Sequence, residues 1–168
     1  MRCLTAGVTA RARQRAETSR VTLTVTDGRS YPTHPHLAVS AAIIRDRKVL
    51  IVRRARPPAR GLFTLPGGGV EVGETLHEAI IREVREETAL AIEPLGLAGH
   101  REVIARDQDG KVARHFVILP FAARWISGDV VLNEELAEAH WLAPAELEGL
   151  ATTDGLADIV RAAFVIAG

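Results

Sequence analysis

The order of apolar and polar residues predicts short strands interrupted by one long helix. Residues 37–44 and 49–52 are almost wholly apolar and are separated by four charged residues, so they predict a two-stranded hairpin. Two further strand regions, at 91–106 and 111–126, flank the turn-forming sequence Asp-Gln-Asp-Gly. Two glycines predict a break within the first of these regions.

Shorter apolar runs complete the pattern. Residues 62–66 predict a short strand that leads into three consecutive glycines. Residues 127–139 read as a loop before a short strand at 140–142. Pro144 then opens a small helix, and residues 154–166 have the period of an amphipathic helix.

The long helix is predicted at residues 75–88, which contain no proline or glycine and are rich in Glu, Arg, Leu and Ala. Glu74-Thr75 is a suitable start. Projection at about 100° per residue places four apolar side chains on one side, which we expect to face the core. These residues are Leu76, Ala79, Ile80 and Val84.

Acidic residues continue this apolar side towards the helix C-terminus. Glu83 and Glu87 fall within the same arc, and Glu86 lies about 60° beyond Glu83. Unpaired buried carboxylates cost several kcal/mol, and the helix dipole disfavours negative charge at this end. A divalent cation such as Mg²⁺ would compensate them; partial pairing with Arg82, or a solvated face, remains the alternative.

Composition excludes some classes of function. The chain has 168 residues, 47% apolar and 25% charged, which suits one globular domain. Its formal net charge of zero gives no electrostatic reason to expect nucleic-acid or membrane binding. Cys3 is the only cysteine, which excludes an intramolecular disulfide and fits a cytoplasmic location.

The N-terminal segment differs from the rest. The first twenty residues hold five arginines against one acid, a composition that also resembles a transit peptide. We expect 1–35 to be an N-terminal extension, disordered or loosely attached, and 36–168 to be the folded domain. Residues 21–25 alternate Val and Thr as a short strand would, and residues 31–36, at the boundary of the extension and the domain, read as a proline-stiffened linker.

Residues 68–90 resemble the signature of Nudix hydrolases, G-x5-E-x7-R-E-U-x-E-E-x-G-U, in which U is a bulky apolar residue. This signature is called the Nudix box, and its three metal-binding glutamates are called the box glutamates. The residues that match are Gly68, Glu74, Arg82, Glu83, Val84, Glu86, Glu87 and Leu90. Ala89 stands where the family has glycine. The resemblance implies an α/β fold, a Nudix-type α-β-α sandwich around a mixed β-sheet.

The resemblance also implies a metal centre. Glu83, Glu86 and Glu87 would hold Mg²⁺, for which Mn²⁺ can substitute, and the backbone carbonyl of Gly67 or Gly68 would be a further ligand.

Two matched residues would support the centre. Glu74 and Arg82 occupy positions that the family usually joins in an ion pair between loop and helix. Ala89 occupies a position where glycine suits a left-handed helix end, at a cost of about 1 kcal/mol for alanine. The alternative is that this helix ends differently.

The resemblance leaves the water-activating base open. It would be a box glutamate, Glu86 or Glu83, or an acid from a later loop. Glu135, six residues before Trp141, is our candidate for the later acid, with Glu134 the alternative.

A basic loop precedes the glycines. Arg53, Arg54, Arg56 and Arg60 offer guanidinium groups for a pyrophosphate. We expect Arg53, Arg54 and Arg60 to contact substrate, although a solubilising loop would have the same composition. Phe63 could stack a base or belong to the core.

The activity implied is hydrolysis of a pyrophosphate bond in a nucleoside diphosphate linked to a group X. The markers of the ADP-ribose, dinucleoside polyphosphate and NADH branches are absent, which favours a nucleoside triphosphate, possibly damaged, cleaved to monophosphate and pyrophosphate. ADP-ribose or a nucleotide sugar is the alternative substrate, and a non-catalytic nucleotide sensor is the alternative of another class. The expected partner is a nucleotide, and the expected state is a monomer or homodimer.

Overall fold

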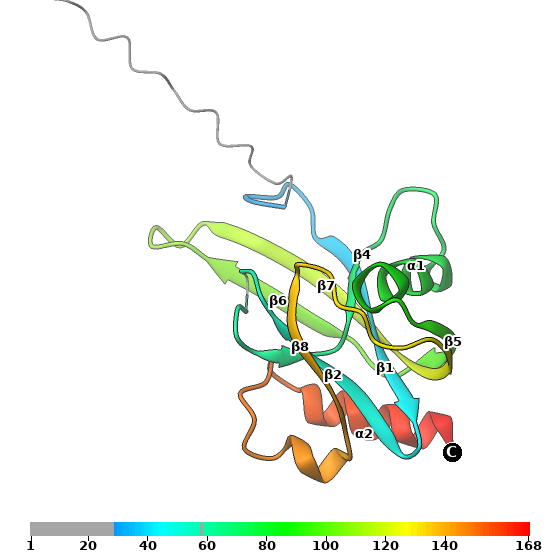
Figure 1. Ribbon diagram of the computed structural model, residues 1–168. Helices are drawn as coiled ribbons and strands as arrows, with labels where there is room; N and C mark the ends of the chain where they lie inside the picture. The colour runs from blue at the N-terminus through cyan, green and yellow to red at the C-terminus, as the bar shows by residue number, and fades with distance from the viewer. Residues whose placement is uncertain (1–28, 58) are drawn as a thin grey trace, which may run out of the picture.

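The computed structural model describes residues 29–57 and 59–168, which form one mixed sheet with a helix on each face (Figure 1). The sheet order is β3-β2-β1-β7-β5, with β4, β6 and β8 pairing off this path. The strands are β1 (His36–Arg45), β2 (Lys48–Arg54), β3 (Phe63–Thr64), β4 (Gly67–Gly69), β5 (Ala91–Leu97), β6 (Arg101–Arg106), β7 (Val112–Ser127) and β8 (Leu136–Leu142). The helices are α1 (Leu76–Thr88), the short 3-10 helix η1 (Pro144–Leu147) and α2 (Leu156–Ala167).

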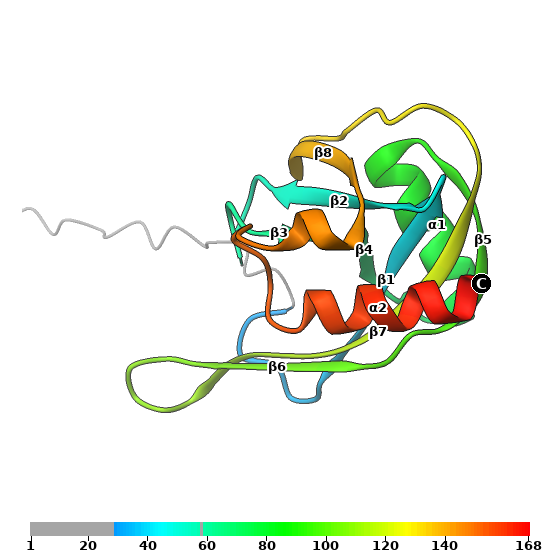
Figure 2. The ribbon, with the colours of Figure 1, turned by 90° about the horizontal axis from the view of Figure 1, so that it is seen from below.

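Strand β1 organises the sheet because side-chain alternation gives it two buried faces. It pairs antiparallel with β2 and β4 and parallel with β7. Val39, Ala41 and Ile43 belong to the core cluster shared with α1, whereas Ala42 belongs to the cluster shared with α2. Figure 2 shows α1 and α2 on opposite sides of the sheet, as the α-β-α sandwich expectation requires.

Helix α1 begins as the sequence predicts. Thr75 is its N-cap: the Thr75 hydroxyl accepts from Glu78 N, and the Glu78 carboxylate accepts from Thr75 N, so both residues form a capping box. At the other end, Ala89 adopts the left-handed conformation with φ 60°, and its N–H bonds the Arg85 carbonyl. Alanine therefore occupies the backbone conformation that glycine would adopt with less strain.

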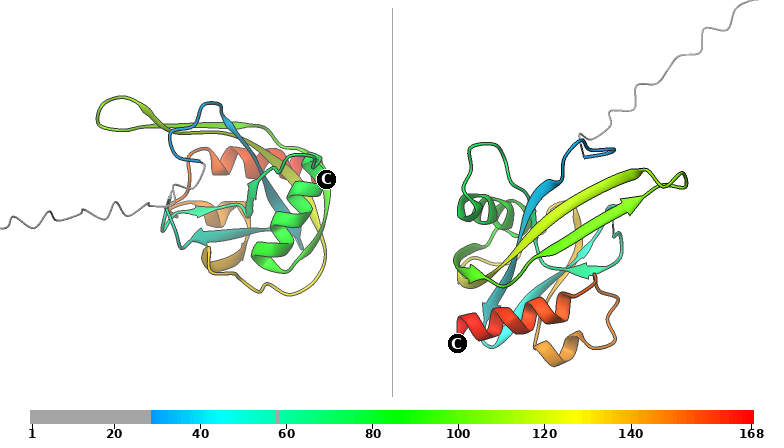
Figure 3. Two further views of the ribbon diagram at one scale, coloured as in Figure 1. Left: turned by 90° about the horizontal axis from the view of Figure 1, so that it is seen from above. Right: turned by 180° about the vertical axis from the view of Figure 1, so that it is seen from behind.

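The predicted break after the helix is present. Strand β5 ends at Leu97 and β6 begins at Arg101, and both pair antiparallel with consecutive parts of β7. The predicted turn closes the β6–β7 hairpin, with Asp107 N bonded to the Lys111 carbonyl. Figure 3 shows this hairpin projecting beyond the rest of the sheet.

Three parts of the chain differ most from the prediction. Residues 67–69, expected to be a loop, form strand β4 because they pair with β1. Strand β8 begins at Leu136, within the predicted loop, because Leu136 pairs with Arg54, the last residue of the antiparallel strand β2. His36, read as a linker residue, is the first residue of β1, because it pairs with Phe116 of β7. The strand predicted at 21–25 lies outside the described residues.

Candidate active site

The three consecutive glycines of β4, Gly67–Gly69, are called the glycine loop below, and they lie against the acidic C-terminal end of α1. Gly67 and Gly68 pair with β1, and the Gly67 N–H donates to the Glu87 carboxylate at 2.7 Å. A Cβ at Gly68 would overlap the Glu83 carboxylate, and a Cβ at Gly67 would overlap the Val39 carbonyl. Only glycine therefore allows the loop to approach both the strand and the acids this closely.

The three box glutamates differ in burial. The Glu83 side chain is 15% exposed and the Glu86 side chain 59% exposed, while Glu87 is 4% exposed. Burial, with smaller contributions from the charges of Glu83 and Glu135, raises the pKa of Glu87 to about 7. Burial also raises the pKa of Glu83, although its hydrogen bond with Arg82 acts in the opposite direction. Two desolvated carboxylates thus face the glycine loop, with the more exposed Glu86 beside them.

Arg82 joins the helix to the preceding loop. Its guanidinium donates to both carboxylate oxygens of Glu74, at 2.6 and 2.9 Å, and to the Gly69 carbonyl at 3.0 Å. It also contacts Glu83 at 2.9 Å and, more distantly, Glu86 at 3.4 Å. The Arg82 cation therefore neutralises Glu74 and also pairs with Glu83, whereas Glu87 accepts a hydrogen bond from the backbone N–H of Gly67.

A second loop, residues 128–135, covers the end of α1. Val131 N donates to the Thr88 carbonyl and Asn133 N to the Glu87 carbonyl. Val130 and Leu132 pack against the core cluster beneath α1. The loop thus satisfies carbonyls that a helix end leaves without partners. Sequence reasoning did not find this contact, because nothing in the loop's composition shows where it docks.

The loop separates the two candidate acids. Glu134 forms an ion pair with Arg56 at 2.5 Å, whereas the Glu135 charge acts on Glu83 and Glu87. The Glu134 carboxylate is therefore held at the basic loop, whereas Glu135 is near enough to Glu83 and Glu87 for its charge to contribute to their raised pKa.

The basic-loop residues have different surroundings. Arg53 pairs with Glu138 of β8 at 2.6 Å. Arg54 is partly buried, and its charge acts on Glu87. Arg60 is exposed in the turn before β3. Phe63 is partly buried and packs against the core cluster of α2, with its ring 5.9 Å from that of His140.

The donor set fits a hard divalent cation. The carboxylates of Glu83 and Glu87 lie beside the backbone of the glycine loop, and burial disfavours the charge on both of them. Within 29–57 and 59–168, no three His, Cys, Asp or Glu side chains stand close enough together to hold an ion as they are. Each buried carboxylate is instead bonded to its own partner, Glu83 to Arg82 and Glu87 to Gly67.

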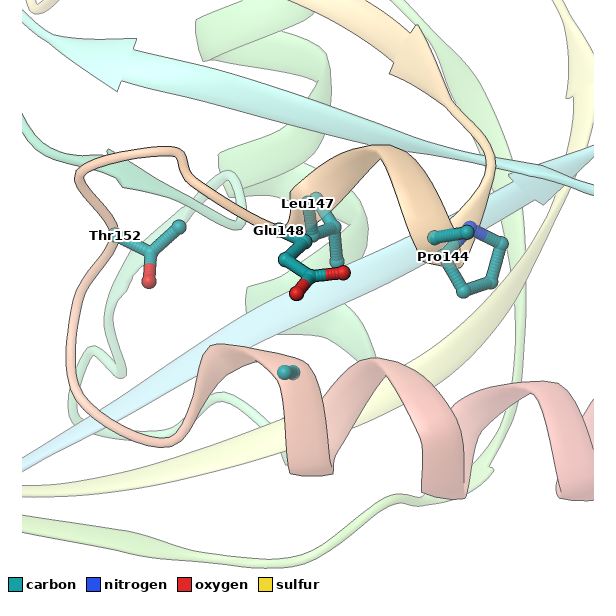
Figure 4. Close-up of a pocket in the computed structure, with 6 residues that line it drawn as sticks. Pro144, Leu147, Glu148 and Thr152 are labelled. Carbon is teal, nitrogen blue, oxygen red and sulfur yellow. The ribbon is translucent and has the colours of Figure 1, made fainter.

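The best-defined cavities of the described residues lie elsewhere. One, of about 250 Å³, is bordered by η1 and the start of α2, and its lining includes Pro144, Leu147, Glu148 and Thr152 (Figure 4). A neighbouring cavity of about 380 Å³ continues along α2 to Phe164. Neither includes a box glutamate, so the site is recognised by its acids rather than by its concavity.

No helix of the described residues is long and apolar enough to cross a membrane.

Comparison with known proteins identifies the class. Residues 34–162 match the family model described as the NUDIX domain. The chain belongs to the Nudix hydrolase family, which confirms the resemblance and the fold class expected from residues 68–90. Nudix hydrolases generally use divalent metal ions.

Individual relatives cover part of the chain. An ADP-ribose pyrophosphatase of Methanocaldococcus jannaschii is 37% identical over 108 residues, 64% of this chain and 62% of the relative. The NAD-capped RNA hydrolase NudC of Escherichia coli O1:K1 / APEC is 34% identical over 111 residues, 64% of this chain and 40% of the relative. The match therefore spans less than two thirds of either relative. Among solved structures, a MutT NUDIX hydrolase from Burkholderia pseudomallei superimposes with a TM-score of 0.66 at 28% identity, covering 76% of this chain and 97% of the other.

Proposed function

We propose that this protein hydrolyses a pyrophosphate bond in a nucleoside diphosphate linked to a group X. The observation that carries the proposal is the buried carboxylate of Glu87 and the partly buried carboxylate of Glu83, both held against the glycine loop at Gly67 and Gly68. Buried acids without a neutralising cation are costly, so a site that retains them has a use for positive charge. The relatives named as pyrophosphatase and NAD-capped RNA hydrolase support the same chemistry.

In this proposal Mg²⁺ is held by Glu83, Glu86 and Glu87, with the Gly67 or Gly68 carbonyl as a further ligand. When bound, it neutralises the pyrophosphate oxygens and favours the attack of water on phosphorus. Mn²⁺ has similar oxygen-ligand preferences and would substitute.

The chain's own groups bind substrate and move the proton. Arg54 lies close enough for its charge to act on Glu87, so it is best placed of the basic-loop residues to contact a phosphate. Arg60 is exposed and able to turn towards substrate, whereas Arg53 would first have to leave Glu138. Glu135 would accept the proton of the attacking water as a P–O–P bond breaks, with the leaving phosphate keeping the bridging oxygen.

Two substrate classes remain under this proposal. The absence of the other branches' sequence markers favours a nucleoside triphosphate, possibly damaged, which would yield a monophosphate and pyrophosphate. The 37% identical relative is named ADP-ribose pyrophosphatase, which favours ADP-ribose, cleaved to two monophosphates. The products distinguish the two classes.

The test is a panel of nucleoside triphosphates, ADP-ribose and nucleotide sugars, incubated with Mg²⁺ and followed by chromatography of the products. We expect turnover with Mg²⁺ or Mn²⁺, none with EDTA, and a kcat lower by about two orders of magnitude or more with Glu87→Gln. Binding of a nucleotide without turnover in any metal would support a sensing domain instead. Full turnover in EDTA would contradict the metal assignment.

A further inference from the structure

Asn133, the only asparagine of the chain, joins the end of α1 to the candidate base. Its backbone N–H donates to the Glu87 carbonyl at 3.3 Å, and its carbonyl accepts from Leu136 N at 3.3 Å. Its side-chain Oδ1 accepts from Glu135 N at 2.9 Å. This residue therefore contacts both the helix that carries the buried acids and the backbone of Glu135.

The side-chain bond is a local turn in which an asparagine oxygen binds the N–H two residues later. It holds the backbone at Glu135 in one orientation relative to Asn133, which is itself attached to Glu87. A second bond, from Ala55 N to the Glu135 carbonyl at 2.8 Å, holds the next peptide group, on the C-terminal side of Glu135. The backbone of Glu135 is thus fixed between α1 and the basic loop.

The two neighbouring acids of this turn have different surroundings. Glu134 forms an ion pair with Arg56, whereas the negative charge of Glu135 contributes to the raised pKa of Glu83 and of Glu87. Loss of the turn would let the peptide rotate and remove the Glu135 carboxylate from the glutamates.

We propose that Asn133 is a positioning residue that acts through Glu135. The inference rests on the proposed function, because it assigns Glu135 a place beside the reacting water. Asn133 touches neither water nor phosphate, and its contribution is to reduce the orientations available to the carboxylate.

The test is a double-mutant cycle of Asn133→Ala and Glu135→Gln, with kcat and KM measured for the substrate that the panel identifies. In the wild-type background we expect Asn133→Ala to lower kcat roughly tenfold, since even small misplacements of a reacting group are costly. KM should change less than about twofold. In the Glu135→Gln background the same substitution should cause no further loss, because the carboxylate it positions is already absent.

Two further variants separate positioning from stability. Asn133→Ser keeps a neutral acceptor oxygen and should restore most of kcat. Asp107→Ala is the matched control: Asp107 Oδ1 makes the same kind of bond to Asp109 N at 3.0 Å, at the distant tip of the β6–β7 hairpin. It should leave kcat unchanged. Thermal midpoints of all variants show whether each one folds.

The outcomes are distinct. An additive loss in the Glu135→Gln background, or a kcat of Asn133→Ala equal to wild type, overturns the inference. If Asn133→Ala does not fold, Asn133→Ser with the same cycle decides, because failure of the serine to retain activity would contradict the acceptor role. Absence of wild-type turnover on the whole panel would instead contradict the proposed function.

Discussion

Burial differs sharply among residues of the same type in this protein. Glu87 is 4% exposed and has its pKa raised to about 7, whereas the Glu86 side chain, one residue earlier, is 59% exposed. The same residue type thus supplies a desolvated group and a solvated one to one site. A buried metal ligand destabilises the metal-free fold. Its substitution should therefore raise the stability of the metal-free protein while it lowers the activity.

Glu87→Gln should lower kcat by two orders of magnitude or more, because a metal ligand that stabilises the transition state is lost. In EDTA at pH 8 the same variant should have a higher thermal midpoint than wild type, because glutamine keeps an acceptor for Gly67 N and removes the buried charge. Glu86→Gln should lower kcat similarly but leave the midpoint nearly unchanged, since its side chain is more exposed. Near wild-type kcat in either variant at saturating Mg²⁺ would exclude that residue as a ligand.

Glu74 provides a prediction on pH. Its hydrogen bonds with Arg82, then that with Glu71 N, lower its pKa from 4.5 to about 2. A lowered pKa stabilises the fold fully above about pH 4.5, and this contribution disappears as pH falls towards 2. The thermal midpoint of Glu74→Gln should therefore lie below wild type at pH 6, with the gap closing between pH 4.5 and 2. Glu71→Gln, at the exposed end of the same turn, is the control; a gap of constant size across this range would contradict the ion-pair role.

Ala89 gives a prediction of opposite sign. Its φ of 60° is left-handed, where glycine avoids the strain of a Cβ. Ala89→Gly should stabilise the protein by about 0.5–1 kcal/mol after the greater freedom of glycine in the unfolded chain is deducted. Chemical denaturation measures the change, and kcat should remain that of wild type. Ala91→Gly, in strand β5, should destabilise, which distinguishes relief of strain from a general effect of glycine.

At the scale of elements, α1 is defined at both ends by contacts of different origin. Its start is local, through the Thr75–Glu78 capping box. Its end depends on the loop at 128–135, whose N–H groups bond the carbonyls of Glu87 and Thr88. Because this loop leads directly into β8, which pairs with β2, the sheet and the helix together determine where Glu135 lies.

Glu135→Gln should therefore lower kcat more than Glu134→Gln, while KM changes little in both. The charge of Glu135 acts on Glu87, whereas Glu134 pairs with Arg56 at the surface. A surface pair contributes at most about 1 kcal/mol, so removal of Glu134 should have a small effect. Steady-state kinetics at saturating Mg²⁺ measure both; equal small effects would return the role of base to Glu86 or Glu83.

At the scale of the whole molecule, every matched residue of the Nudix signature lies within the part of the chain that the structure describes. The first strand begins at His36, and both core clusters are formed by residues 39 onwards. The site lies on the α1 side of the sheet, while the β6–β7 hairpin and α2 occupy other parts of the molecule (Figure 3).

Deletion of residues 1–28 should leave kcat, KM and the thermal midpoint close to those of the full chain. The first twenty residues are rich in arginine, and the strand-like pattern of the segment is confined to the short Val-Thr alternation at 21–25. The deletion leaves Tyr31, whose N–H bonds the Ala113 carbonyl of β7, in place. A fall in either activity or midpoint would mean that the segment contributes to the domain or its site.

The sequence alone was sufficient for α1, for its acidic face and for the family, because local periodicity and the spacing of Gly68, Glu74 and Glu83 are carried by one continuous segment. It was also sufficient for the hairpin β1–β2 and the turn at Asp107, whose signals are local. Only the tertiary structure decided that β8 begins at Leu136 and that Asn133 bonds the Glu87 carbonyl. These contacts join residues far apart in the chain, and a strand edge or a helix end accepts any backbone N–H that packing brings to it. The side chains do not encode such partners, so the position of Glu135 depends on how the whole sheet assembles.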